Sequence, residues 1–359
     1  MAFSPPPPPP PVPGKTWQHV TPAAAGFDGA ELQHLSGLAE QGKSTCLIVA
    51  RGGKLVAESD YRKTGPNSVQ DIYSATKSIA SVLVGIAQDE GRLDVDDPAS
   101  RWIAPWRGTP SSGVTVRDLL SNDSGRQWSP QIDYQQLLGA PDRTAFAVGL
   151  SQTSVPGSVW AYNNSAVQTL EQVLRVATGE GVAKFAQDHL FGPLGMDHTK
   201  MAVDRAGHAQ LFEGVQSTCR DLARFGTLMA DDGRWGKRQV VSKAWVRAAT
   251  GAPSQKLNAA YGLLWWLNRP GTIAEDPLVA TDLAAATDPQ AKHGQVVAGA
   301  PSDMYWALGL GNQVVQVDPG SGTVVVRLGT AERPKPPTFG PAQAAAVVTK
   351  ALRQGHHHG

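Results

Sequence analysis

Residues 73–86 read Tyr-Ser-Ala-Thr-Lys-Ser-Ile-Ala-Ser-Val-Leu-Val-Gly-Ile. The large apolar residues of this stretch recur at steps of three and four, namely Ile79, Val82, Leu83 and Ile86. That spacing predicts a helix with one apolar face. Ser74 lies at the start of the helix, and Lys77 follows one turn later on the same side. The stretch therefore places a hydroxyl and an amine together at a helix start.

A serine next to a lysine is a possible nucleophile and base. A serine hydroxyl is a weak nucleophile until its proton is taken, and a lysine held neutral takes it. The positive end of the helix disfavours an ammonium group and favours an oxyanion. Ser74-x-x-Lys77 is the chain's only Ser-x-x-Lys. Taken alone, the pattern equally fits a capped helix with a solvated lysine.

Composition limits the function classes. The 359 residues are 41% hydrophobic and 18% charged, which is typical of a globular protein with a large core. The formal charge of +1 gives no basic footprint for nucleic acid. Cys46 and Cys219 are too few for a disulfide framework, so we expect two buried small residues. No apolar run reaches membrane-spanning length. With no export signal, the sequence as written suggests the cytoplasm, and a trimmed signal would allow secretion or the periplasm.

The order of predicted elements indicates the fold class. Hairpins are expected at residues 46–58 and 313–328, and helices at 30–41, 74–91, 167–178, 182–190, 221–229 and 343–352. Residues 261–267 read as a strand. Residues 114–120 form a short helix that Thr115 and Asp118 cap. Hairpins near both chain ends predict an antiparallel sheet flanked by helices, an α/β (α+β) fold with a helical insert.

The domain organisation follows from these elements. The sheet domain comprises residues 15–91 and 207–354, and a mainly helical insert occupies residues 92–206. The Pro-rich residues 1–14, with eight of the 27 prolines, are expected to be a disordered spacer, and residues 355–359 a disordered tail. Residues 272–303 form the least patterned part, which is typical of a lid or binding loop.

A second chemical pattern is Tyr162-Asn163-Asn164, the chain's only Tyr-x-Asn. In an extended segment the first and third side chains point the same way. Tyr162 would pass the serine proton to a leaving group, and Asn164 would hold Lys77 and the acyl chain of a substrate. The alternative is a turn capped by asparagine, with the tyrosine in packing.

Together these pieces resemble the serine β-lactamase and penicillin-binding protein superfamily, in its class C β-lactamase-like branch of esterases, D-aminopeptidases and nylon-oligomer hydrolases. The resembling segments are residues 51–55, 73–77, 114–125, 156–164, 191–196 and 217–226, with the terminal hairpin. The resemblance implies a β-lactamase/transpeptidase-like fold and a serine hydrolase of esters or amides with an acyl-enzyme intermediate. The resemblance implies no metal and no organic cofactor. It implies a small-molecule ester or amide as the partner. The oligomeric state stays open.

The third motif of this family departs from its usual form. A Lys or His is expected near residues 309–313, and this chain has Gly-Leu-Gly-Asn-Gln there. Without that cation, a charge-assisted hydrogen bond to a substrate carboxylate is lost. Backbone chemistry remains: Gly311 lets a substrate lie along the strand, and the N–H groups of Asn312 and Ser74 would form the oxyanion hole.

Three alternatives qualify this assignment. Arg327 or His293 would restore the missing cation if either folded into the same place. By resemblance to nylon-oligomer hydrolases, Tyr134 is expected to lie over the substrate, or else to serve in packing. We therefore expect a hydrolase of carboxylic esters or amides with weak β-lactamase activity. One alternative is an amidase, D-peptidase or nylon-oligomer-type hydrolase. The other is a slowly hydrolysing penicillin- or peptidoglycan-binding protein.

Overall fold

A computed structural model describes residues 8–275, 292–331 and 338–353. Its main sheet has six strands in the order β2-β1-β13-β12-β11-β8, and every neighbouring pair is antiparallel. The strands are β1 (Ser44–Arg51), β2 (Lys54–Asp60), β8 (Trp266–Leu267), β11 (Tyr305–Gly309), β12 (Gln313–Asp318) and β13 (Thr323–Gly329). Because β1 pairs directly with β13, the two ends of the chain meet in the centre of the sheet. The expected antiparallel sheet and both hairpins are confirmed.

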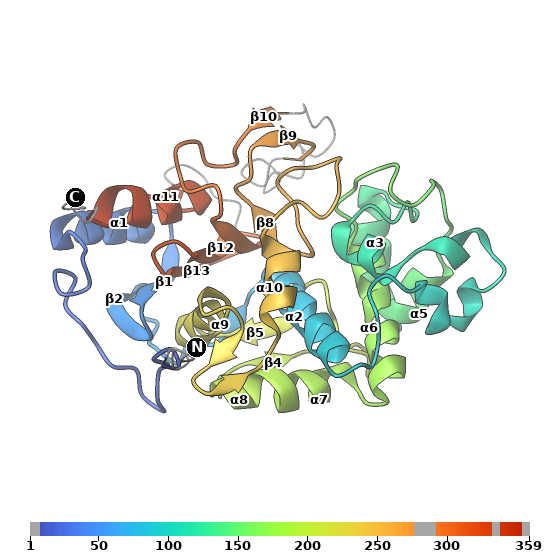
Figure 1. Ribbon diagram of the computed structural model, residues 1–359, viewed down its shortest axis with the longest axis horizontal. Coiled ribbons are helices and arrows are strands. Elements are labelled where there is room, and N and C mark those ends of the chain that lie inside the picture. Colours follow the sequence, from blue (N-terminus) through green and yellow to red (C-terminus); the bar gives the residue numbers. More distant parts are fainter. Residues whose placement is uncertain (1–7, 276–291, 332–337, 354–359) are drawn as a thin grey trace, which may run out of the picture.

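Helices cover both faces of this sheet (Figure 1). Helices α1 (Gly29–Gln41) and α11 (Pro341–Ala346) pack on one face, and α9 (Cys219–Ala230) packs on the other. A side chain at Gly226 of α9 would lie 2.4 Å from Val324, so glycine is needed for this close approach. Strands β12 and β13 are buried throughout, which matches their runs of valine.

Further helices gather beside the sheet (Figure 1). They include α3 (Val116–Ser121), α4 (Leu137–Gly139), α5 (Arg143–Gly149), α6 (Asn164–Thr178), α7 (Val182–Ala186) and α8 (Gly192–Leu194). The predicted capping box of α3 is present: Thr115 accepts from the Asp118 N–H, and the Asp118 carboxylate accepts from the Thr115 N–H. Such reciprocal bonds satisfy two amides that the helix leaves unpaired.

The central helix α2 (Thr76–Asp89) is more buried than its periodicity predicts. Every residue from Thr76 to Ala87 is buried, so the helix has no solvated face there. Small residues on the other faces make this possible, because a side chain at Gly85 would clash with Trp245 of α10 (Lys243–Thr250) at 2.4 Å. The helix is therefore enclosed by neighbours, and the groups at its start have fixed surroundings.

Smaller sheets complete the fold. Strands β3 (Gln70–Asp71), β5 (Val215–Ser217) and β4 (Lys200–Met201) form one; β6 (Arg234–Trp235) and β7 (Arg238–Gln239) form a hairpin, as do β9 (Gly271–Ile273) and β10 (Lys292–Gly294). The last hairpin lies within the stretch expected to lack pattern, of which residues 276–291 fall outside the described part. The expected strand at 261–267 is wrong except for β8, since the Gly262 N–H donates to the Trp265 carbonyl and turns the chain back.

Two expectations for the remaining segments need revision. Cys46 and Cys219 are buried as expected, but they form a disulfide between β1 and the start of α9. Their sequence separation of 173 residues gave no local sign of the pairing. Residues 8–14, expected to be a disordered spacer, lie against the protein body, where the Arg224 guanidinium donates to the Pro13 and Gly14 carbonyls. The rest of that segment, and residues 355–359, fall outside the described part.

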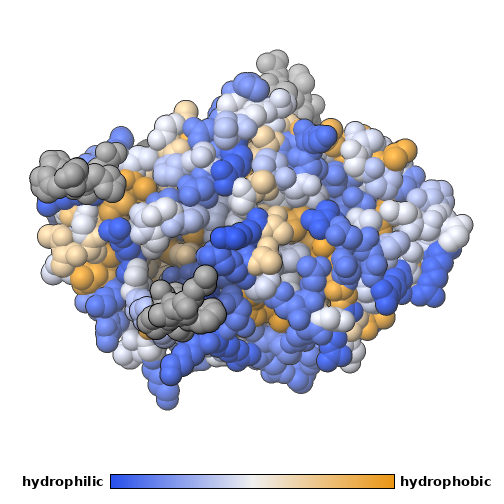
Figure 2. All heavy atoms as spheres, in the orientation of Figure 1, coloured by the Kyte–Doolittle hydropathy of each residue, from blue (hydrophilic) through white to orange (hydrophobic). Residues whose placement is uncertain are grey.

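The surface drawn in Figure 2 is mostly hydrophilic, with apolar side chains scattered over it. Among the described residues, no helix has both the length and the apolar character needed to cross a membrane.

Candidate active site

Ser74 lies in a short 3₁₀ turn, Tyr73–Ala75, that leads directly into α2. Tyr73 has a φ of +48°, in the left-handed region. A non-glycine residue pays about 1–2 kcal/mol for that conformation, and such strain gathers at functional sites. The turn places the Ser74 side chain ahead of the first turn of α2, where Lys77 projects on the same side.

The predicted serine–lysine pair is in contact. Lys77 Nζ lies 2.9 Å from Ser74 Oγ and donates to the Phe212 carbonyl at 3.1 Å. Lys77 is 1% exposed, and burial lowers its pKa to about 7, although the carboxylates of Asp133, Glu213 and Glu275 act in the opposite direction. A buried ammonium is costly because the protein solvates its charge less well than water does. Near neutral pH a large share of Lys77 is thus the neutral amine.

Tyr162 joins the same network. Its hydroxyl hydrogen-bonds to the Ser74 side chain and accepts from the Trp266 indole. Burial raises the pKa of the phenol far above its usual value, so the hydroxyl keeps its proton near neutral pH. Lys77 Nζ lies 4.6 Å from the centre of the Tyr162 ring. The site therefore combines a serine hydroxyl, an amine whose pKa is lowered and a protonated phenol.

An aromatic cluster supports Tyr162 from behind. The Tyr162 ring is 5.4 Å from Trp266 and 6.1 Å from Tyr261, and the Tyr261 and Trp266 rings meet edge to face at 4.8 Å. Trp160 packs on Tyr261 at 5.4 Å. Aromatic pairs in such geometries add stability beyond their buried area. This packing holds the phenol in one orientation.

Asn164 lies close by but does not have the predicted partner. It is the first residue of α6, and its N–H donates to Asp133 at 2.6 Å. Its side-chain oxygen is buried and has no hydrogen-bond partner among the described residues. The second contact of Lys77 is the Phe212 carbonyl. A main-chain carbonyl carries no sequence signature, which explains why Phe212 was missed.

The third motif lies beside the nucleophile through its first glycine. An added side chain at Gly309 would lie 2.1 Å from the Ile72 carbonyl, so the end of β11 runs against the turn that carries Ser74. Gly311 and Asn312 follow in the next turn, where both have positive φ and both carbonyls accept from Arg327. The Asn312 side chain lies against Gly340. Position 309 is thus the member of the motif in closest contact with the nucleophile turn.

Neither candidate cation occupies the place of the missing one. Arg327 is 2% exposed. Its guanidinium donates hydrogen bonds to Ser44 Oγ and to the carbonyls of Gly42, Gly311 and Asn312. His293 is exposed on β10. Leu310 is 41% exposed and apolar. Within the described residues, the charged groups that act on Lys77 are carboxylates.

Two further side chains line the neighbourhood of the phenol. Tyr134 lies in a helical turn, Ile132–Gln136, and burial raises its pKa to about 12. Glu275 follows β9 and forms no hydrogen bond or ion pair with another described residue. Burial raises the pKa of Glu275 to about 7, and the Lys77 charge opposes this shift. The sequence gave no sign of Glu275, because it lies in the unpatterned stretch.

Comparisons with known proteins give relatives in sequence and in fold. The family model described as Beta-lactamase matches residues 29–350. The 6-aminohexanoate-dimer hydrolase of Paenarthrobacter ureafaciens is 24% identical over 273 residues, which cover 67% of this chain and 69% of that protein. A penicillin-binding protein homologue from Caulobacter crescentus superposes with a TM-score of 0.66 at 16% identity, covering 92% and 97% of the two chains. EstCE1, a hydrolase with promiscuous acyltransferase activity, gives a TM-score of 0.65 at 16% identity, covering 88% and 98%.

Proposed function

Because the chain belongs to the beta-lactamase family, whose members are serine hydrolases, we propose that it hydrolyses carboxylic esters through an acyl-enzyme on Ser74. The observation that carries this proposal is the contact of Lys77 Nζ with Ser74 Oγ at 2.9 Å, with the pKa of Lys77 lowered to about 7. A base is most effective when its pKa lies near the working pH. This amine meets both the geometric and the electrostatic requirement.

The first half-reaction forms the acyl-enzyme. Lys77 takes the Ser74 proton while Oγ bonds to the substrate carbonyl carbon, and the carbonyl oxygen becomes an oxyanion. Tyr162, protonated and hydrogen-bonded to Ser74, delivers a proton to the departing alkoxide as its bond to carbon breaks. The products are the alcohol and an ester on Ser74. In the second half-reaction a water molecule attacks that ester with the same groups in reverse, and the carboxylic acid leaves.

The oxyanion needs two N–H donors, and we assign them to Ser74 and Leu310. Strand β8 pairs with β11 only at Tyr305 and Trp306, so the same edge of β11 is open beyond Trp306. Peptide groups alternate between the two edges of a strand. The Met304 carbonyl accepts from Asn268 on this edge, and the alternation directs the Leu308 and Leu310 peptide groups the same way. The Asn312 amide, expected from the sequence, lies farther along the turn.

Electrostatics favour a neutral or cationic substrate over an anionic one. Among the described residues, the charged groups that act on Lys77 are the carboxylates of Asp133, Glu213 and Glu275. Glu275, which forms no hydrogen bond or ion pair with another described residue, favours a second candidate function: hydrolysis of esters or amides whose acyl part carries an amine. The relative from Paenarthrobacter ureafaciens is named for such a compound, the 6-aminohexanoate dimer.

The disulfide supports an oxidising compartment as the place of action. Structural disulfides persist in secreted and periplasmic proteins and are rare in the reducing cytosol. We therefore favour a secreted or periplasmic location over the cytoplasmic one that the sequence suggests. The Cys46–Cys219 bond joins β1 to α9, two central elements of the fold.

Intact-protein mass spectrometry tests the proposed reaction. The full chain is mixed with p-nitrophenyl esters, p-nitroanilides and a fluorescent penicillin, and the mass and the released chromophore are followed together. We expect ester turnover with a transient mass increase of one acyl group, which Ser74→Ala abolishes without lowering the melting temperature. A stable penicillin adduct without ester turnover would indicate the slow binding protein instead. Ester turnover by a folded Ser74→Ala variant would refute the nucleophile.

A further inference from the structure

The hydrogen bond from Lys77 to the Phe212 carbonyl decides the direction of the amine. A neutral amine has two N–H groups and one lone pair, and only the lone pair accepts the serine proton. With one N–H on the Phe212 carbonyl at 3.1 Å, the remaining N–H and the lone pair are the groups that can meet Ser74 Oγ at 2.9 Å, and proton transfer uses the lone pair. Phe212 lies outside any helix or strand. Main-chain bonds close the turn around it, since the Gly214 N–H donates to the Gln210 carbonyl at 2.9 Å, and side-chain contacts add to them.

One arginine holds the chain on both sides of Phe212. Arg143 Nη1 donates to Gln210 Oε1 at 2.6 Å and to Glu213 Oε1 at 2.8 Å. The same guanidinium lies 5.6 Å from the centre of the Phe212 ring. Its planar group presents several donors in a fixed geometry, which a lysine cannot reproduce. A single side chain thus spans residues 210–213.

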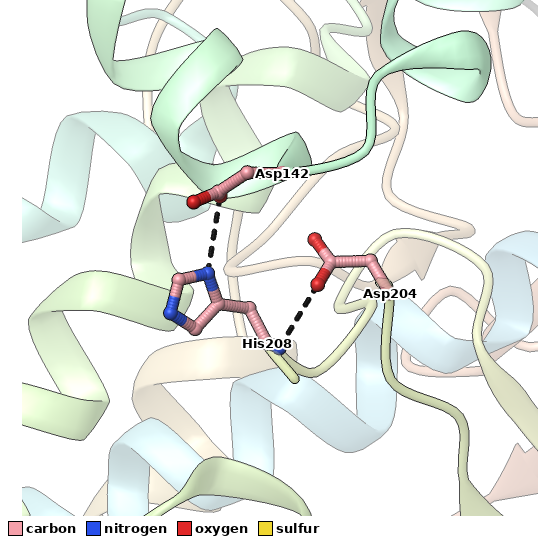
Figure 3. A group of neighbouring side chains, drawn as sticks. All are labelled: Asp142, Asp204 and His208. Atoms are coloured by element: carbon pink, nitrogen blue, oxygen red, sulfur yellow. Dashed lines mark hydrogen bonds and ion pairs between the residues drawn. The ribbon is translucent and has the colours of Figure 1, made fainter. Parts of the chain in front are cut away.

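A group of three side chains fixes Arg143 in turn (Figure 3). Asp142, the N-cap of α5, accepts from the Ala145 N–H and pairs with His208 Nδ1 at 3.1 Å. Asp204 accepts from the main-chain N–H groups of Arg143 and His208 at 2.9 and 3.0 Å. These three residues could by type hold a metal ion. However, both carboxylates already accept main-chain hydrogen bonds, which explains the group as a clamp between α5 and residues 204–208.

We propose that Arg143 is a positioning residue for Lys77: it fixes residues 210–213 so that the Phe212 carbonyl turns the amine toward Ser74. This proposal rests on the proposed function, since it takes Lys77 as the base. No substrate contact is required of Arg143.

The ion pair also gives the proposal an electrostatic signature. Three carboxylates act on Lys77: Asp133 in the turn 132–136, Glu213 in residues 210–213, and Glu275 after β9. The Tyr162 ring also faces its amine. Glu213 favours the ammonium form, and Arg143 neutralises Glu213. Loss of the arginine charge should raise the pKa of Lys77, whereas loss of the Glu213 charge should lower it. The two partners of one ion pair therefore shift the pH profile in opposite directions.

Steady-state kinetics on the full-length protein test this. With p-nitrophenyl butyrate over about pH 5–9, we expect Arg143→Met to lower kcat on the order of tenfold or more, because small misplacements are costly. KM should change little. The acidic limb of the pH profile, where kcat falls as Lys77 becomes protonated, should move to higher pH. Glu213→Gln should keep most of kcat and move the limb to lower pH. Arg143→Lys keeps the positive charge, so the pH of the acidic limb should return closer to its wild-type value than kcat does.

Arg220→Met is the matched control, because Arg220 pairs with Glu58 at 2.6 Å between α9 and β2, and no hydrogen bond or ion pair among the described residues joins Arg220 to Arg143 or to residues 210–213. Its kinetics should equal those of the wild type. If Arg143→Met fails to fold, Arg143→Lys and Glu213→Gln still test the proposal. The proposal for Arg143 would be overturned if kcat and the acidic limb were unchanged in the Arg143 and Glu213 variants, or if both variants moved the limb in the same direction. The proposed reaction would then stand or fall separately, on the Ser74→Ala result.

Discussion

Lys77 Nζ lies over the Tyr162 ring, 4.6 Å from its centre, and within 2.9 Å of Ser74 Oγ. A ring face attracts a cation, but burial outweighs that attraction here and lowers the pKa of Lys77 to about 7. Because the base must be neutral, activity should rise as the pH rises through about 7, and it should not fall again until Tyr162 ionises far above. A pH profile of kcat/KM checks this, and a flat profile across neutrality would contradict it.

Replacement of Lys77 by arginine separates charge from basicity. Arginine keeps the positive charge but remains protonated at every accessible pH, so it cannot take the serine proton. Lys77→Arg should therefore lower kcat roughly 10²–10⁴-fold, the usual cost of losing a general base. The measurement is ester turnover above the acidic limb, with the melting temperature as the check on folding. A loss of less than about tenfold would remove Lys77 from this role.

Substrate charge is the next test. Since the resemblance leads us to expect a cation near Leu310, where this chain has an apolar side chain, p-nitrophenyl butyrate should exceed nitrocefin in kcat/KM. A charge-assisted hydrogen bond contributes about 1.5–3 kcal/mol, which corresponds to on the order of 10–150-fold. Leu310→His should narrow the difference by improving nitrocefin. If the wild type turns over nitrocefin as well as the ester, another residue supplies the charge and the esterase assignment fails.

Glu275 should distinguish cationic from neutral acyl groups. Its pKa is raised to about 7, so the carboxylate is charged above that pH and its attraction for a cation is lost below it. At about pH 8 an alkylammonium group is still protonated. Glu275→Gln should then lower kcat/KM for the p-nitroanilide of 6-aminohexanoic acid on the order of tenfold. The anilide of hexanoic acid serves as the neutral control, and an equal loss on both compounds would exclude charge recognition.

The disulfide should contribute to stability. A cross-link mainly restricts the unfolded chain, and bonds of this kind contribute typically about 2–4 kcal/mol. Thermal unfolding with and without a reducing agent measures this, and peptide mapping under non-reducing conditions verifies the Cys46–Cys219 link. The Cys46→Ala, Cys219→Ala double variant should unfold at a lower temperature and be indifferent to reductant. Identical melting of the oxidised and reduced protein would show that the bond adds nothing.

The elements with local causes were predictable from the sequence. The hairpins, the helices and the cap of α3 by Thr115 and Asp118 depend on periodicity and on residues a few positions apart. Ser74, Lys77 and Tyr162 were found because their side chains have recognisable chemistry at a fixed spacing. Their contact with one another is confirmed by geometry, while their roles stay predictions.

Features that depend on contacts distant in the chain were not predictable. The Phe212 carbonyl reaches Lys77 from 135 residues away and uses a main-chain atom, which any residue type provides. Gly309 was passed over for Asn312, because a motif does not reveal which of its residues touches the nucleophile turn. The Cys46–Cys219 bond likewise required the pairing of β1 with β13, on which α9 packs.

The bond between β1 and α9 has a topological consequence. It closes residues 46–219 into a covalent ring, and this ring contains Ser74, Lys77, Tyr162 and Phe212. The most exposed large apolar side chain inside the ring is Val155, at 72%. A protease that cut the chain there would leave both fragments tethered, with the nucleophile on one and the phenol on the other. In the nicked protein, the fragments that carry Ser74 and Tyr162 would stay covalently joined until the disulfide was reduced.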